Sequence, residues 1–270
     1  MFLTKLKYYC LILLLIILFT SCSEYQKVLK SNDLEFKFEK AIEYYEEGEY
    51  HRARTLLEDL RSYYRGTEKA EKINYYNAYC HYGTGELTLA AYLFREFSMT
   101  FPNSTRREEA EYMAAYCYYL LSPPISLDQV FTKRAIQELQ LFLERYSKSE
   151  RRDTVNIFID ELQEKLELKA YNNAYLYYKI SSYRAAVTAL NNVLIDYPDT
   201  VYREEILFYI LKSNYEYAEN SVLDKQEERY KDVIQAYYNF VDNFPESSKI
   251  REAERIYNNS TKFIKENYGL

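Results

Sequence analysis

The residue types that most often perform acid–base or metal chemistry are scarce in this sequence. It contains only two histidines, His51 and His81, so it has neither an H-E-x-x-H pair nor a multi-histidine metal site. It has no C-x-x-C pair, and its five glycines form no phosphate-binding loop. His81 could act as a base, but no nucleophile stands at a matching spacing, and a lone histidine on a helix is usually structural. We therefore expect no enzymatic activity, no cofactor and no metal.

The position of Cys22 points to covalent attachment of lipid. Lys5 and Lys7 precede an uncharged apolar run, Leu11–Phe19, which is too short to span a hydrocarbon core of about 30 Å as a helix. A basic start, a short apolar run and small residues after it are typical of a secretory signal peptide. The sequence Phe19-Thr20-Ser21-Cys22 resembles the bacterial lipobox, with phenylalanine where leucine is usual.

These signals divide the N-terminal region into two parts. We expect a lipoprotein signal peptide over residues 1–21 and a lipidated tether over residues 22–33, with Cys22 as the site of lipid attachment, including palmitate. Three acyl chains exceed the two signals that stable anchoring needs, so the protein would be held on a membrane without spanning it. The alternative is an ordinary signal peptide followed by a chance cysteine.

Composition and charge narrow the possibilities for the rest of the chain. Only 5 of the 270 residues are glycine and 5 are proline, too few for a sandwich or barrel with a turn every ~8–12 residues. The hydrophobic share of 48% and the charged share of 28% suit a helical protein with a packed core. The net charge is −6, and −8 once residues 1–21 are removed, which argues against nucleic acid as a partner.

A repeated helix boundary organises residues 34–270. An aromatic residue is followed by proline or a substitute and, two places later, by serine or threonine, which stops one helix and caps the next. The five occurrences are Tyr64-Arg65-Gly66-Thr67, Phe101-Pro102-Asn103-Ser104, Tyr146-Ser147-Lys148-Ser149, Tyr197-Pro198-Asp199-Thr200 and Phe244-Pro245-Glu246-Ser247. This pattern predicts an all-α fold, a right-handed α-α superhelix of about five TPR-like helix-turn-helix repeats. Residues 248–267 would form a C-terminal capping helix.

Each repeat also carries a pattern inside its helices. Ala53, Ala90 and Ala186 are small residues that let two antiparallel helices approach closely, and large apolar residues follow four and seven places later. We expect longer loops between the two helices of repeat three, over residues 122–133, and of repeat five, over residues 219–228.

Tyrosines recur on one face of the first helix in each repeat. We number each repeat so that the small residue of its first helix, Ala78, Ala115 or Ala174, is position 8. Tyrosine then stands at positions 5, 9 and 12 of repeats two, three and four, and these positions share one helix face. These residues are Tyr75, Tyr79 and Tyr82, then Tyr112, Tyr116 and Tyr119, then Tyr171, Tyr175 and Tyr178. The corresponding positions are Phe38, Ile42 and Tyr45 in repeat one and Ile210, Asn214 and Tyr217 in repeat five.

This pattern allows two interpretations. An aromatic stripe at helical spacing is commonly part of a core. However, a buried phenol needs a hydrogen-bond partner, so leucine or phenylalanine would serve a dry core better. In TPR domains this face lines the concave groove, and a tyrosine-lined groove can hold an extended peptide without strict sequence demands. We therefore predict that the nine rings are partly exposed.

Cys80 and Cys117 occupy position 10 of adjacent repeats. Equivalent positions on neighbouring helices should lie roughly 8–10 Å apart. That separation exceeds the limit of about 7 Å for a disulfide. We predict two free, buried thiols.

The mature chain as a whole resembles the BamD family, the lipoproteins of the outer-membrane β-barrel assembly machinery, in its Bacteroidetes form. The resemblance rests on the lipobox cysteine, the five repeats and several short stretches. These are residues 64–70 (YRGTEKA), 76–83 (YNAYCHYG), 100–104 (TFPNS), 122–129 (SPPISLDQ), 196–200 (DYPDT) and 218–221 (AENS). Arg65 and Ser147 stand where the family often has proline, which weakens two helix stops.

The resemblance implies a function and partners. Members of this family are non-enzymatic scaffolds, lipid-anchored on the periplasmic face of the outer membrane. Their C-terminal repeats dock on the POTRA domains of the barrel subunit BamA, and their N-terminal groove is thought to receive unfolded outer-membrane protein segments. The peptide-binding candidates in this chain are Tyr45, Tyr75, Tyr79, Tyr82, Tyr112, Tyr116 and Tyr119, the first four being carried over from the family.

Three other functions remain open at this point. A secretin pilotin or another cell-envelope scaffold would share the anchor and the repeats. A glycan-binding lipoprotein is disfavoured because the chain is short and has no tryptophan for sugar stacking. An enzyme is disfavoured by the lack of a catalytic constellation.

Overall fold

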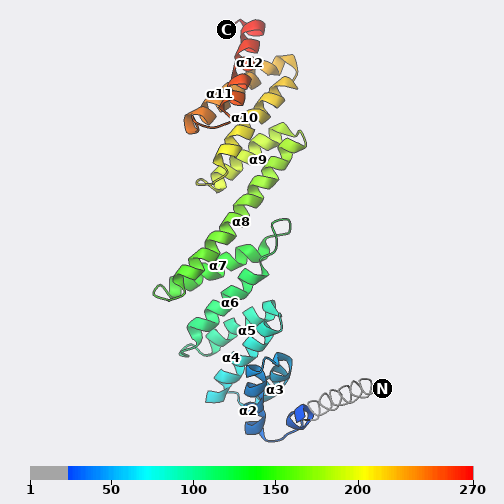
Figure 1. Ribbon diagram of the computed structural model, residues 1–270, viewed down its shortest axis with the longest axis vertical. Helices are drawn as coiled ribbons and strands as arrows, with labels where there is room; N and C mark the ends of the chain where they lie inside the picture. The colour runs from blue at the N-terminus through cyan, green and yellow to red at the C-terminus, as the bar shows by residue number, and fades with distance from the viewer. Residues whose placement is uncertain (1–23, 270) are drawn as a thin grey trace, which may run out of the picture. The chain divides into compact units, whose positions relative to one another are not determined.

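The computed structural model describes residues 24–269, and this part of the chain is helical without strands (Figure 1). Residues 24–29 form a short helix, in which Val28 is buried, and eleven longer helices follow in the described range. These are α2 (Leu34–Glu46), α3 (Tyr50–Tyr63), α4 (Glu68–Gly83), α5 (Leu87–Thr100), α6 (Arg107–Leu121), α7 (Val130–Arg145), α8 (Arg152–Lys179), α9 (Tyr183–Asp196), α10 (Arg203–Glu219), α11 (Leu223–Asn243) and α12 (Ile250–Tyr268).

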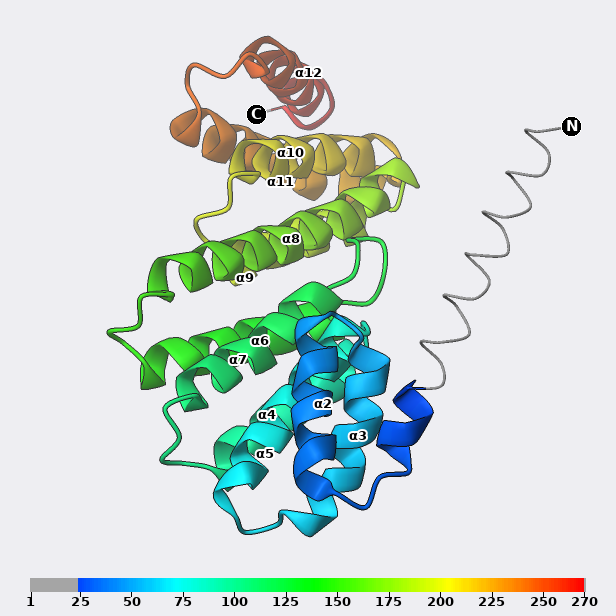
Figure 2. The same cartoon turned by 60° about the horizontal axis from the view of Figure 1, so that its bottom comes forward.

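The helices form five consecutive helix-turn-helix repeats and a final helix. The pairs are α2–α3, α4–α5, α6–α7, α8–α9 and α10–α11, and the first two pairs are seen side by side in Figure 2. Helix α12 packs against α11 and α10 through buried residues that include Ala253, Ile256 and Ile264. The predicted all-α fold of TPR-like repeats with a C-terminal capping helix is confirmed.

The chain divides into two compact units, each with its own core. Unit 1 contains the chain up to Pro123 together with Gln129–Leu162, and unit 2 contains Pro124–Asp128 and the residues from Gln163 onward. Helix α8 contributes to both. It begins at Arg152, well before the segment that matches the repeat pattern. This early segment packs against α7 in unit 1. The buried residues there are Val155, Ile159 and Leu162 of α8 and Leu139 and Phe142 of α7.

The small residues of the repeat pattern lie where the paired helices approach most closely. Ala53, Ala90 and Ala186 of the second helices are fully buried, and so are the position-8 alanines of the first helices. A larger side chain at these places would separate the helices, which is why the pattern repeats there.

Three aromatic side chains meet at the end of most repeats. In repeat two, the buried ring of Phe97 lies 5.5 Å from Tyr75, at position 5, and 5.2 Å from Phe101, at the helix stop. Repeats three and five have the same arrangement, with Phe142 between Tyr112 and Tyr146 and with Phe240 between Phe208 and Phe244. The aromatic residues of these three helix stops are therefore packed against the core.

Hydroxyl groups after the helix stops join successive repeats. Ser104 donates a hydrogen bond from Oγ to Glu71 Oε1 at 2.8 Å and accepts one from the backbone N–H of Arg106 at 3.0 Å. Three other junctions have the same hydroxyl-to-carboxylate bond: Ser149 to Glu108 (2.6 Å), Thr200 to Glu167 (2.5 Å) and Ser247 to Glu204 (2.7 Å). We call these four contacts the junction bonds. A hydrogen bond to a charged group typically contributes about 1.5–3 kcal/mol.

The junction bonds correct the predicted helix caps. Helix α6 has Arg106 at its N-cap, two residues after Ser104, and no side chain caps its first N–H groups. Ser104, which was expected to cap α6, thus closes the turn before this helix and bonds to Glu71 of the preceding repeat. Thr67 does stand at the N-cap of α4, but its hydroxyl donates to the carbonyl of Tyr64 at 2.7 Å and caps nothing.

Two predicted loops have different outcomes. In repeat three, the loop covers residues 122–129, close to the prediction, and Lys169 of α8 donates to the carbonyls of Ile125 and Leu127 at 2.7 and 3.0 Å. In repeat five, the predicted loop over residues 219–228 is wrong. Helix α11 begins at Leu223, so the extra residues lengthen the helix.

The turn between paired helices requires a left-handed residue. Gly48 and Gly85 have φ of 78° and 79°, and each N–H donates to the carbonyl three residues earlier. Ser181 occupies the same place in repeat four with φ of 59° and the same hydrogen bond. A side chain in this conformation costs roughly 1–2 kcal/mol, whereas glycine adopts it freely.

We expect Ser181→Gly to raise the free energy of unfolding by about 0.5–1 kcal/mol, because it removes that strain at some cost in chain entropy. Gly85→Ala should lower it by about 1 kcal/mol, since alanine would take on the same strain at φ of 79°. Urea unfolding followed by far-UV circular dichroism measures both. The explanation is wrong if the two substitutions shift the midpoint in the same direction.

Cys80 and Cys117 are free and fully buried, as predicted. Burial raises the pKa of both thiols to about 12. Because the thiolate is the reactive form, we expect neither to react with a thiol reagent at neutral pH while the protein is folded. Mass spectrometry after labelling, with and without denaturant, measures this. Rapid modification of either residue in the folded protein would contradict its burial.

Candidate binding surface

The structure brings together the seven peptide-binding candidates, which all lie in unit 1. We call them the tyrosine surface: Tyr45 of α2, Tyr75, Tyr79 and Tyr82 of α4, and Tyr112, Tyr116 and Tyr119 of α6. All seven side chains are half-buried, as are Tyr171, Tyr175 and Tyr178, so the predicted partial exposure of the nine rings is confirmed.

Ring contacts run along each helix and between neighbouring helices. On α4, the centroid of Tyr79 lies 4.9 Å from that of Tyr75 and 6.4 Å from that of Tyr82. On α6, Tyr116 stacks on both Tyr112 and Tyr119, at 5.7 and 5.8 Å. Tyr45 connects α2 to α4, with its centroid 6.4 Å from that of Tyr79. Residues spaced by three and four on a helix thus lie side by side, as the pattern predicts.

Two aromatic residues of this surface were missed by sequence reasoning. Phe158, in the early part of α8, stacks on Tyr119 at 4.2 Å and on Tyr116 at 5.6 Å. Tyr76 lies 4.8 Å from Tyr45. Phe158 belongs to the part of α8 that precedes the repeat pattern, so only continuous helical periodicity through residues 152–179 could have found it.

Hydroxyl groups on the surface bond to carboxylates on the first helix of the next repeat. Tyr79 donates to Glu109 at 2.8 Å, and Tyr119 donates to Glu161 at 2.6 Å. Burial is the main cause that raises the pKa of Tyr79, and the hydrogen bond to Glu161 raises the pKa of Tyr119 to about 12. These phenols therefore remain neutral near pH 7, and they offer ring faces and hydrogen bonds but no negative charge.

Basic side chains lie over the position-5 rings. Arg106, which also pairs with Glu71 at 3.0 Å, has its guanidinium carbon 5.4 Å from the Tyr75 centroid. Arg151 lies 4.4 Å from the Tyr112 centroid. Such cation–π contacts contribute about 0.5–1 kcal/mol at exposed sites. They help to hold these two rings in place.

A cavity lies at the repeat-one end of the tyrosine surface. It has a volume of about 320 Å³, and Phe38, Ile42 and Tyr76 supply its apolar lining. Glu39, Glu43, Glu46 and Lys72 complete its wall. Phe38 and Ile42 are the residues predicted at positions 5 and 9 of repeat one, so the surface continues into this cavity.

Unit 2 has its own aromatic group. Tyr171, Tyr175 and Tyr178 stack along α8 at 5.9 Å intervals. Tyr202 lies parallel to Tyr171 at 4.9 Å, and Tyr209 contacts Tyr175 at 4.5 Å and Tyr178 at 5.0 Å.

The predicted register of repeat five is shifted by two residues. Each junction bond ends on the glutamate four residues before position 5, as Glu71 precedes Tyr75. In repeat five that glutamate is Glu204, so position 5 is Phe208. Positions 9 and 12 are then Lys212 and Tyr215, in place of the predicted Asn214 and Tyr217.

His81, the lone candidate base of the sequence, lies in a charged network. The side chain is buried, with Nδ1 2.7 Å from Glu86 and Nε2 3.4 Å from Glu58. Arg54 also pairs with Glu86, at 2.6 Å, and this hydrogen bond is the main cause that lowers the pKa of Glu86. The arrangement joins α3, α4 and α5. His51 is exposed on α3.

Comparison with known families decides what kind of protein carries this surface. The model of the YfiO family, described as outer membrane lipoprotein, matches residues 31–229. The chain belongs to the YfiO family. This family is BamD-like, so the resemblance drawn from the sequence is confirmed at the level of the family. The protein is accordingly an outer membrane lipoprotein built as a helical-repeat scaffold.

No curated protein matches the sequence significantly. Among solved structures, the crystal structure of the P58(IPK) TPR domain has 14% sequence identity and a TM-score of 0.41, and the match covers 91% of this chain and 69% of that one.

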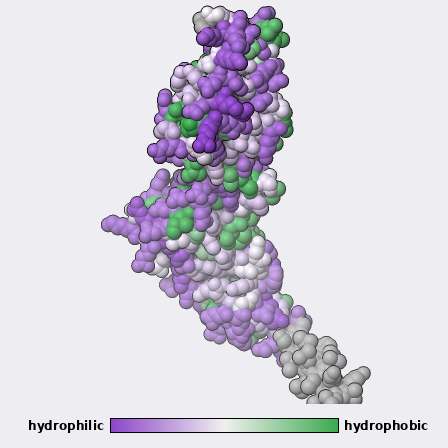
Figure 3. Space-filling model, turned by 45° about the horizontal axis from the view of Figure 1, so that its top comes forward, coloured by the Kyte–Doolittle hydropathy of each residue, from purple (hydrophilic) through white to green (hydrophobic). Residues whose placement is uncertain are grey.

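The predicted anchor of this YfiO family member lies outside the described residues, since these begin at residue 24. Within residues 24–269, none of the helices combines the length and apolar character needed to cross a membrane. Figure 3 shows one face of the molecule, on which hydrophilic residues predominate and hydrophobic ones form small groups.

Proposed function

We propose that this protein is a non-enzymatic scaffold of the β-barrel assembly machinery of the outer membrane, of the Bacteroidetes type. Membership of an outer membrane lipoprotein family over residues 31–229 is the observation that carries this proposal. The half-exposed tyrosine surface on repeats one to three supports it, because a scaffold that handles unfolded chains needs an apolar surface that is stable in water.

Cys22 is the proposed site of lipid attachment. In this proposal, residues 1–21 are removed as a signal peptide and residues 22–33 tether the solenoid of residues 34–270 to the periplasmic face of the outer membrane. Cys22→Ser should then leave the membrane fraction and incorporate no labelled palmitate, whereas the unaltered protein should remain in the membrane fraction and incorporate the label. A Cys22→Ser protein that stays membrane-bound without a partner would remove the anchor from the proposal.

The tyrosine surface is the proposed binding site for unfolded outer-membrane protein segments. Its neutral phenols and ring faces can contact any extended chain with aromatic or aliphatic side chains, because stacking and hydrogen bonding at these rings make few sequence demands. Repeats four and five are the proposed site for the POTRA domains of a BamA-like barrel subunit. The two sites then belong to different compact units of the chain.

Site-specific cross-linking in cells tests the surface without removing its rings. We would place the photoreactive residue p-benzoylphenylalanine at Tyr82 or Tyr116. Matched controls are Tyr63 and Tyr92, which are 62% and 60% exposed but lie outside the surface. We expect cross-links to unfolded barrel proteins from the first pair and not from the second. Equal cross-linking at all four positions would assign no binding role to the surface.

Depletion tests the assignment to barrel assembly. Outer-membrane barrel proteins should lose abundance when this protein is depleted, and a BamA-like barrel subunit should copurify with it. Normal barrel assembly after depletion would refute the proposal. Recovery of a secretin in place of the barrel subunit would favour a pilotin instead.

A further inference from the structure

The cavity at the repeat-one end of the tyrosine surface, which we call the repeat-one cavity, combines an apolar lining with an acidic wall. Phe38 and Ile42 lie one turn apart on α2, and Tyr76 of α4 completes the apolar lining. Phe38 is buried, and the other two side chains are half-buried. An engineered apolar cavity of about 150 Å³ binds benzene, so a volume of about 320 Å³ has room for one phenylalanine or leucine side chain.

The charged residues that line the repeat-one cavity are mainly acidic. Glu39, Glu43 and Glu46 follow one another at helical spacing along α2, and all three are exposed. Lys72 of α4 lines the cavity with them and is also exposed. Three glutamates against one lysine leave two negative charges in excess on the lining.

Basic residues next to the repeat-one cavity do not cancel this excess, because they already have carboxylate partners. Lys40 pairs with Glu43 at 2.8 Å. Lys69, whose Nζ lies 5.7 Å from the Phe38 centroid, pairs with Glu35. When both pairs are counted with the lining, four glutamates stand against three lysines and one negative charge remains. The cavity therefore keeps an acidic wall after its neighbours are included.

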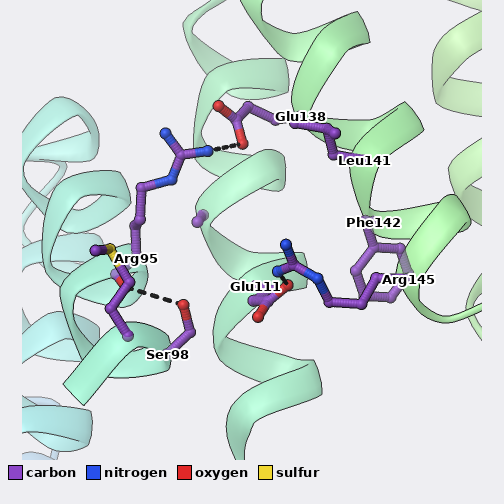
Figure 4. Close-up of a pocket in the computed structure, with 9 residues that line it drawn as sticks. Arg95, Ser98, Glu111, Glu138, Leu141, Phe142 and Arg145 are labelled. Atoms are coloured by element: carbon purple, nitrogen blue, oxygen red, sulfur yellow. Dashed lines mark hydrogen bonds and ion pairs between the residues drawn. The ribbon is translucent and has the colours of Figure 1, made fainter. Parts of the chain in front are cut away.

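A cavity of unit 1 among α5, α6 and α7 differs in this respect (Figure 4). Its lining contains two arginines and two glutamates, which form the pairs Arg95–Glu138 and Arg145–Glu111. Because these charges balance, the lining favours neither an acidic nor a basic ligand. The excess of carboxylates thus distinguishes the repeat-one cavity from this one.

We propose that the repeat-one cavity binds a basic segment of an unfolded outer-membrane protein. One aromatic or aliphatic side chain of the segment lies in the cavity, and a lysine or arginine beside it contacts Glu39 and Glu46. The inference rests on the proposed function, which supplies the unfolded segment. Charge complementarity selects the basic residue, because an acidic segment would add negative charge to the wall. The rest of the segment can continue onto the tyrosine surface, since Tyr76 of the cavity lies 4.8 Å from Tyr45.

Fluorescence polarisation with labelled peptides tests the proposal on the full-length protein purified in detergent. The probe is Lys-Lys-Phe-Lys-Lys, blocked at both ends, and the comparison peptides are Glu-Glu-Phe-Glu-Glu and Lys-Lys-Gly-Lys-Lys. We expect the probe to bind more weakly as ionic strength rises. Each comparison peptide should bind at least about tenfold more weakly than the probe, since one lacks the matching charge and the other lacks the ring.

Substitutions of exposed carboxylates locate the binding. The wall variant combines Glu39→Gln and Glu46→Gln, which removes two negative charges from the cavity and should weaken probe binding about tenfold. The matched control combines Glu47→Gln and Glu49→Gln, because these two residues are also exposed and lie nearby but do not line the cavity. The control variant should bind the probe like the unaltered protein.

Equal affinity of the wall variant and the unaltered protein would overturn the inference, and so would equal binding of the acidic peptide or of the glycine peptide. An equal loss of affinity in the wall and control variants would show attraction by net charge alone and would overturn it too. These measurements do not depend on barrel assembly. Failure of the proposed function would appear separately, as normal barrel assembly after depletion.

Discussion

Replacement of Phe97 by alanine is expected to destabilise unit 1 by about 3–5 kcal/mol, the usual range for deleting a buried aromatic side chain. Phe97 is 1% exposed and lies between Tyr75 and Phe101. These neighbours are held by the Arg106 contact and by the helix stop, so we expect them to collapse only partly into the space left behind.

Phe240→Ala is the matched substitution in unit 2, because Phe240 has the same place in repeat five and is equally buried. Amide hydrogen exchange locates the effect of each change. Protection should fall mainly in α4 to α6 for Phe97→Ala and mainly in α10 to α12 for Phe240→Ala, since each unit has its own core. Equal loss of protection throughout both units in either protein would contradict the division.

The second large effect is expected at alkaline pH. Burial raises the pKa of Tyr171 and of Tyr230 to about 12, and the hydrogen bond to Glu161 does the same for Tyr119, against a usual value near 10. Between these values the folded protein keeps protons that the unfolded chain has lost. The free energy of unfolding should therefore be unaffected by these groups below about pH 10 and should fall as pH rises towards 12.

Absorbance at 295 nm measures tyrosinate directly, and the absence of tryptophan leaves the signal to the 33 tyrosines. We expect a fraction of them to titrate well above pH 10, together with the loss of helical circular dichroism. Tyr171→Phe and Tyr230→Phe should each reduce the alkaline loss of stability, because phenylalanine cannot ionise. If every tyrosine ionises near pH 10 while the helices persist, the buried environment of these rings is wrongly described.

The repeat register could be predicted wherever alanine marks position 8. In repeats two to four, Ala78, Ala115 and Ala174 are fully buried, and counting from them placed nine tyrosines correctly on one face. Repeat five has Leu211 at that position. Its helix α10 is buried on several sides, at residues that include Ile206, Phe208 and Ile210, so apolar periodicity did not single out one register.

The helix boundaries were harder to predict than the repeats. Residues 223–228 are mostly polar, which predicts a loop, yet they include no glycine or proline and favour a helix once Gln226 and Tyr230 are buried. The early part of α8 is likewise free of helix breakers. It brings Phe158 to the tyrosine surface through a packing contact with α6, which no local pattern contains.

The junction bonds explain how such a chain tolerates insertions. The hydroxyl and the glutamate that it contacts are 33 residues apart at two junctions, but 41 and 43 residues apart at the other two. In repeat three, the additional residues form the loop after α6. In repeat five, they lengthen helices α10 and α11. Length can therefore vary within a repeat during evolution while the connection to the next repeat keeps the same geometry.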